Sequence, residues 1–95
     1  MIGSFLLLPK AQIEILDAWV WYEGQRPGLG DQFKDEVGKQ IKLVVKNPLY
    51  YQLKGKYREA KTAIFPFLIV YRYNKRTNMV LIVSVFHTSR HPKRK

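Results

Sequence analysis

The sequence of 95 residues contains no cysteine, only two histidines and only seven acidic residues. Without thiols, disulfide bonds and thiolate metal sites are excluded, and a cytoplasmic setting is expected. With two histidines and no clustered carboxylates, we expect neither a metal site nor a cofactor. No hydrophobic run approaches the roughly 20 residues that cross a bilayer, and the apolar stretch at residues 5–8 is too short for a signal peptide.

What the chain has in excess is positive charge. Seventeen Lys and Arg give a formal net charge of +10, which attracts polyanions. Nucleic acid, the ribosome or an acidic protein are therefore the expected partners, rather than a membrane or a small-molecule substrate. With 46% hydrophobic and 14% aromatic residues, the composition predicts a single globular domain over residues 1–95, in which residues 93–95 form a flexible basic tail.

The first half of the chain predicts a short strand and two helices. The strand covers residues 4–8, and apolar residues then recur at helical spacing over residues 10–25 and from about residue 30 to Asn47. Asp31 is a candidate cap for the second helix. The short turn between the helices predicts an antiparallel hairpin. Gly38 costs the second helix about 1 kcal/mol, and we interpret it as a point of close approach to the first helix.

The second half predicts three strands, at residues 58–64, 67–73 and 79–87, after a connector at residues 49–55. The wholly apolar run at residues 79–83 is typical of a central strand that is covered on both faces along part of its length. The order of elements is β-α-α-β-β-β. It predicts an α+β fold in which the helical hairpin packs on one face of a small, mainly antiparallel sheet.

A set of short motifs in this order resembles the RelE/ParE superfamily of toxins from type II toxin–antitoxin systems, and within it the ParE-like branch of plasmid stabilisation proteins. The motifs cover about residues 9–92 and are Pro9, Ala11, Trp21-Tyr22-Glu23-x-Gln25-x-Pro27-Gly28-Leu29-Gly30, Phe33, Asn47-Pro48, Arg58-Glu59, Phe65-Pro66-Phe67, Tyr71-Arg72 and His87-x-x-Arg90-x-Pro92. The resemblance implies the same β-α-α-β-β-β fold. It also implies an acidic antitoxin as partner, and growth inhibition through DNA gyrase (ParE type) or through cleavage of mRNA in the ribosome (RelE type).

If the chain is a ribonuclease, His87 is the candidate general base for a ribose 2′-hydroxyl. Arg58, Arg72 and Arg90 would then hold the phosphate. The alternative is that His87 only caps a strand. RelE-type sites usually carry a late tyrosine or an acid–base pair, whereas this chain has no tyrosine after Tyr73. This departure weakens the ribonuclease interpretation.

Two further groups of side chains are candidates for binding partners. Lys54, Lys56, Lys61 and Arg90 are candidates for contacts with the target or with nucleic acid. The alternative for the lysines is protection of an exposed edge strand. Trp19, Tyr22 and Phe33 are candidates for a groove, between the helical hairpin and the sheet, that binds the antitoxin.

Three functions follow from these residues. The preferred one is a ParE-like toxin that blocks DNA gyrase by binding, with no chemistry of its own. The alternatives are a metal-independent, ribosome-dependent endoribonuclease of the RelE type and a non-toxic, basic nucleic-acid-binding module. A small acidic reading frame next to the gene would distinguish the first two from the third.

Overall fold

The computed structural model describes residues 3–88 of the chain and contains two helices and five strands in that range. The elements are β1 (Ser4–Leu7), α1 (Pro9–Gln25), α2 (Leu29–Lys46), β2 (Gln52–Lys54), β3 (Tyr57–Lys61), β4 (Phe67–Asn74) and β5 (Met79–His87). The predicted order is confirmed, with one strand added, because the predicted connector contains β2. No described helix is long and apolar enough to span a membrane. The predicted tail at residues 93–95 lies outside the described residues.

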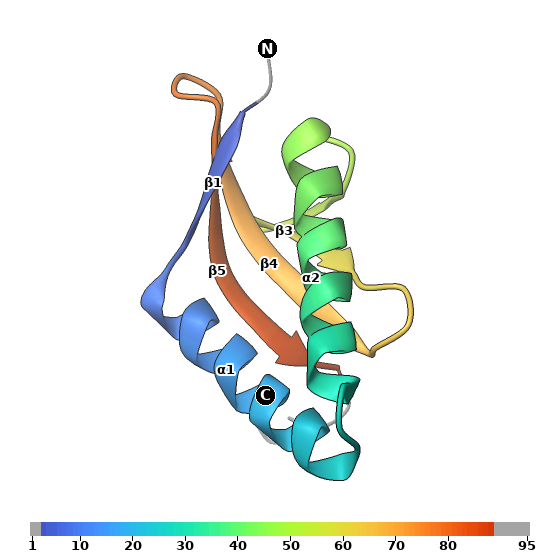
Figure 1. Ribbon diagram of the computed structural model, residues 1–95. Helices are drawn as coiled ribbons and strands as arrows, with labels where there is room; N and C mark the ends of the chain where they lie inside the picture. The colour runs from blue at the N-terminus through green and yellow to red at the C-terminus, as the bar shows by residue number, and fades with distance from the viewer. Residues whose placement is uncertain (1–2, 89–95) are drawn as a thin grey trace.

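The strands form one sheet in the order β1-β5-β4-β3-β2. β1 runs parallel to β5, and the other neighbouring pairs are antiparallel. The last strand therefore lies inside the sheet, as its apolar run predicted. Figure 1 shows both helices in front of the sheet, joined at their lower ends and diverging upward. No helix within residues 3–88 lies on the opposite face of the sheet.

The core lies between the sheet and the helix pair. Alternate residues of β4 and β5 point toward the helices and are buried, among them Ile69 and Tyr71 on β4. The apolar stripe of α2 meets them with the buried residues Phe33, Val37, Ile41 and Val44. An aromatic cluster closes one end, where the ring of Phe33 lies 4.8 Å from that of Phe67 between centroids.

The two helices are in close contact at Gly30. A Cβ atom there would lie 2.7 Å from the carbonyl oxygen of Trp19 and 2.8 Å from the Glu23 carboxylate. A Cβ atom at Gly38 would meet nothing within 4 Å. The predicted reason for Gly38 is therefore wrong, and Gly30 is the residue that the helix crossing requires.

The start of α2 is held by a carboxylate from the other helix. Glu23 accepts hydrogen bonds from the backbone N–H groups of Gly28 (2.8 Å) and Gly30 (2.9 Å), which are among the amides that a helix leaves unpaired. The predicted cap, Asp31, instead accepts a hydrogen bond from the indole N–H of Trp19 at 3.0 Å. Both interactions tie α1 to α2 near the point where they join.

Candidate functional site

Two apolar hollows lie along one side of α2, toward α1 and β1, with volumes of about 400 and 520 Å³. We call them together the helix groove. The first hollow is lined by Leu7, Gln12, Ile15, Leu16, Trp19 and Lys34. The second is lined by Gly3, Ser4, Phe5, Lys42, Val45 and Lys46. Figure 1 shows the corresponding divergence of α2 from β1 and α1.

The rim of the helix groove on α2 is basic, because three lysines fall on one side of that helix. Lys34, Lys42 and Lys46 are all exposed and are separated by whole multiples of four residues. Gly38 occupies the remaining position of this row, halfway between Lys34 and Lys42. The row therefore combines positive charge with a point at which the helix backbone has no side chain.

Of the three residues predicted to bind an antitoxin, the structure places only Trp19 in the helix groove. Its indole is half-buried and is oriented by the hydrogen bond to Asp31. Tyr22 and Phe33 are 7% and 0% exposed and belong to the core. In this fold they cannot touch a partner. Both rings are needed for the core, because they pack on Phe65 and Phe67.

The predicted catalytic residues are not brought together. His87 lies at the end of β5 on the helix side, paired in register with Phe67, and its ring centroid is 5.2 Å from that of Phe67. Arg58 is paired with Tyr71, four positions further along β4, which is about 13 Å at the usual strand rise. Arg72 is exposed on the opposite face of the sheet. Arg90 lies outside the described residues.

The guanidinium of Arg58 is already used inside the protein. It donates hydrogen bonds to the carbonyl oxygens of Tyr51 at 2.8 Å and Leu49 at 3.5 Å. Tyr71 beside it is fully buried, and its hydroxyl donates to the carbonyl oxygen of Pro48 at 2.6 Å. Burial raises the pKa of Tyr71 to about 12, and the nearby positive charge of Arg58 opposes this rise. These groups fasten the segment after α2 to the sheet.

His87 borders a cavity of about 250 Å³ between α1 and the end of β5. Glu14, Asp17 and Trp21 line its α1 side. Glu14 accepts hydrogen bonds from the Ser84 hydroxyl and from the Val85 N–H, both at 2.8 Å, and pairs with Lys10 at 2.7 Å. Because β1 pairs with β5 only as far as Ile82, Glu14 supplies an acceptor beyond the end of β1. Sequence reasoning missed this role, since Glu14 reads as an ordinary polar position on a helix.

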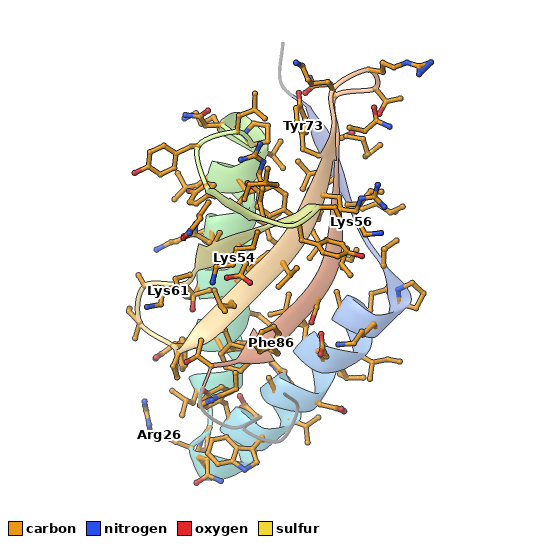
Figure 2. The ribbon with its side chains drawn as sticks, turned by 180° about the vertical axis from the view of Figure 1, so that it is seen from behind. Arg26, Lys54, Lys56, Lys61, Tyr73 and Phe86 are labelled. Atoms are coloured by element: carbon orange, nitrogen blue, oxygen red, sulfur yellow. The ribbon has the colours of Figure 1, made fainter. Side chains whose placement is uncertain are left out.

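The open face of the sheet carries basic side chains around an apolar centre. Register places Lys61 beside Leu68 and Arg72 beside Leu81 on this face, and Lys54 beside Tyr57. We call these the basic sheet face, together with Lys56 in the β2–β3 turn. Figure 2, seen from behind, shows Lys54 and Lys61 at one side of the sheet and the turn with Lys56 passing in front of β4.

Charge is divided unevenly between the two halves of the chain. Residues 51–95 hold eleven of the seventeen Lys and Arg but only one carboxylate, Glu59. Glu59 forms an ion pair with Lys54 at 3.4 Å. Residues 1–50 hold six of each sign. The net charge of the chain therefore comes from residues 51–95. Among residues 3–88 there is no group of three or more His, Asp or Glu side chains that would hold a metal ion.

Comparisons with known proteins agree with this architecture. The structure of the chromosomal ParDE system from P. aeruginosa matches with a TM-score of 0.77, 13% identity, and coverage of 92% of this chain and 96% of that chain. The intact RelBE toxin–antitoxin complex of E. coli matches with a TM-score of 0.66, 18% identity, and coverage of 95% and 100%. The RelBE2 complex of Mycobacterium tuberculosis matches with a TM-score of 0.63, 13% identity, and coverage of 92% and 99%.

These structural matches show a shared fold, and the family is shown by the sequence itself. No match is found among curated protein sequences. The family model for the ParE toxin of the type II toxin–antitoxin system parDE, however, matches residues 5–92, which is nearly the whole chain. The chain therefore belongs to the family of ParE toxins of type II toxin–antitoxin systems.

Proposed function

We propose that this ParE family toxin arrests growth by binding a protein target, with DNA gyrase the preferred target, and that an acidic antitoxin neutralises it by lying in the helix groove. The observation that carries the proposal is the pairing of an apolar groove with a row of lysines on its rim. The structural relatives named above are toxin–antitoxin systems, which supports an antitoxin as partner.

The shape and charge of the helix groove fit an amphipathic acidic segment. Apolar side chains of the antitoxin would bury the exposed surface of Phe5 and Leu16, which are 44% and 59% exposed. Its carboxylates would face Lys42 and Lys46, and such complementarity chiefly raises the association rate and selects the partner. This is the helix-in-groove mode of peptide recognition.

Binding rather than catalysis is supported by where the candidate catalytic groups lie. A ribonuclease would need a base and its cationic partners around one phosphate. Here Arg58 is hydrogen-bonded to two backbone carbonyls, and Arg72 lies on the opposite face from His87. Among residues 3–88, the feature that favours the RelE-type alternative is the basic sheet face, and the same charges would serve contact with an acidic protein.

The test of the target uses purified toxin in a DNA supercoiling assay with gyrase, together with mapping of messenger ends after induction in cells. We expect inhibited supercoiling and no new messenger ends, and the His87→Ala variant should stay toxic. Full gyrase activity at saturating toxin would overturn the proposed target. New messenger ends that disappear in His87→Ala would establish the ribonuclease instead.

The test of the antitoxin site uses a charge reversal with a matched control. The double variant Lys42→Glu/Lys46→Glu should lose rescue by the antitoxin encoded beside the gene. The double variant Lys75→Glu/Arg76→Glu changes the charge equally in the turn between β4 and β5 and should still be rescued. Equal rescue of both variants would remove the antitoxin from the helix groove.

A further inference from the structure

The turn between β3 and β4, residues 62–66, exposes an isoleucine in an unusual way. Ile64 is 79% exposed, the highest value among the large hydrophobic residues that the structure describes. A single exposed apolar side chain is common on protein surfaces, and its exposure alone implies no function. This one lies in a turn whose backbone is fixed by hydrogen bonds on both sides of it.

A carboxylate from α2 holds the backbone of this turn. Glu36 accepts hydrogen bonds from the backbone N–H of Ala63 at 2.5 Å and of Ile64 itself at 2.9 Å. The buried Thr62 hydroxyl donates to the carbonyl oxygen of Phe65 and accepts from the N–H of Phe67 at 3.2 Å. Long-range and local hydrogen bonds therefore hold the turn closed around Ile64.

Two further interactions hold the turn, one with the core and one with the residue after β5. Phe65, the next residue, is 8% exposed, and its ring lies 4.9 Å from that of Tyr22 and 5.7 Å from that of Phe33. The carbonyl oxygen of Pro66 accepts a hydrogen bond from the N–H of Thr88 at 2.8 Å, beyond the end of β5. The fold thus buries Phe65 and turns Ile64 outward, although a polar residue at position 64 would serve the fold equally well.

We propose that Ile64 is the apolar anchor with which the toxin docks into an apolar pocket of an acidic protein, its target. This inference rests on the proposed function and identifies the residue through which the toxin would contact its target. Because the backbone of the turn is already fixed by hydrogen bonds, docking of Ile64 costs little backbone conformational freedom, so binding retains more of the gain from its contacts. Apolar anchors in pockets carry much of the affinity of protein interfaces.

The basic sheet face beside the turn favours a protein with an acidic surface. The Glu36 carboxylate below the turn accepts hydrogen bonds from two backbone N–H groups, whereas Lys61 is exposed three residues before Ile64, at the edge of the basic sheet face. A nucleic-acid backbone would satisfy Lys61 but offers no apolar pocket for an isoleucine. The pairing of an apolar anchor with the basic sheet face beside it therefore favours an acidic protein over RNA or DNA.

The anchor lies away from the helix groove. Glu36, which holds it, is two residues from Lys34 and therefore about 200° around α2 from it. Lys34 lines the helix groove, whereas Glu36 reaches the turn between β3 and β4. A substitution at the anchor should consequently change binding to the target and leave binding to the antitoxin intact.

The experiment compares Ile64→Asp with the control Ile13→Asp, which changes an isoleucine that is 59% exposed on α1. The readouts are growth arrest on induction, the concentration of toxin that half-inhibits gyrase, the affinity for the antitoxin and the melting temperature. We expect Ile64→Asp to raise the half-inhibitory concentration at least about tenfold, with unchanged antitoxin affinity and melting temperature. Ile13→Asp should remain as inhibitory as the wild type.

Three other outcomes would contradict the role of Ile64, and each can be distinguished from the others. A toxic wild type with an equally toxic Ile64→Asp variant overturns the anchor alone and leaves the proposed function standing. Loss of toxicity in Lys61→Glu but not in Ile64→Asp overturns the anchor and points to nucleic acid. A wild-type chain that neither arrests growth nor inhibits gyrase overturns both proposals. As a second variant, Glu36→Ala loosens the turn and should weaken inhibition while antitoxin affinity is kept.

Discussion

Substitutions at Gly38 test the helix groove, because they should stabilise the isolated toxin or leave it equally stable, while a large side chain lowers its affinity for the antitoxin. Alanine at this position should stabilise the isolated toxin, since a Cβ atom would meet no other atom within 4 Å. The gain is the difference in helix propensity between glycine and alanine, about 1 kcal/mol. In a domain of this size, that raises the melting temperature by about 4–8 °C, which thermal unfolding followed by circular dichroism resolves easily.

A larger side chain at the same position should block the antitoxin without harming the fold. Gly38→Leu places four carbon atoms halfway between Lys34, which lines one hollow of the helix groove, and Lys42, which lines the other. We expect antitoxin affinity to fall at least about tenfold, measured by isothermal calorimetry, while the melting temperature does not fall. The control Gln32→Leu adds a leucine at an exposed position of α2 and should leave affinity unchanged.

Two results would refute this reasoning. A lower melting temperature for Gly38→Ala would mean that the helix groove is filled at Gly38 by the protein's own atoms. Full affinity in Gly38→Leu would mean that the antitoxin binds elsewhere. If both results occurred, the helix groove would lose its role in the proposed function.

Three further predictions concern stability. Gly30→Ala should destabilise by about 1–3 kcal/mol in urea unfolding, because its Cβ atom would lie 2.7 Å from the Trp19 carbonyl oxygen; an unchanged midpoint would contradict the close crossing. Phe33→Ala should cost about 3–5 kcal/mol by the same assay, and a cost below 1 kcal/mol would place Phe33 outside the core. The proton on Tyr71 is held more tightly in the folded state than in the unfolded state, so its stabilisation is complete below pH 10 and is lost as the pH rises to about 12. The loss is at most about 2–3 kcal/mol, and Tyr71→Phe should lack this part of the alkaline decline.

The helices and the three long strands were predictable because each carries its own periodic signal. α2 alternates buried and exposed residues at helical spacing, and β5 combines a long apolar run with a preceding turn. β2 gave no such signal. All three of its residues are exposed, and it is a strand only because β3 folds back beside it. Its pairing partner follows after only Gly55 and Lys56, but three exposed residues carry no periodic pattern that marks them as a strand.

The site residues were predicted less well, because a residue type does not reveal what a side chain touches. Tyr22 and Phe33 read equally well as core or as partner surface, and only packing distinguishes the two. Arg58 reads as a phosphate ligand until the carbonyl oxygens of Tyr51 and Leu49 are found beside it. Trp19 was predicted to line a groove for the antitoxin, and the structure places it in the helix groove, while its contact with an antitoxin stays a prediction.

The position of β5 in the sheet has a consequence for synthesis. This strand contributes Val80, Ile82 and Val85 to the core and holds β1 on one side and β4 on the other. Translation delivers it after every other described element, so until residues 79–87 leave the exit tunnel, the N-terminal strand has no neighbour and the helix pair has an incomplete surface to pack on. A nascent or prematurely terminated chain should therefore be harmless, and toxicity should begin only once the strand made last has entered the middle of the sheet.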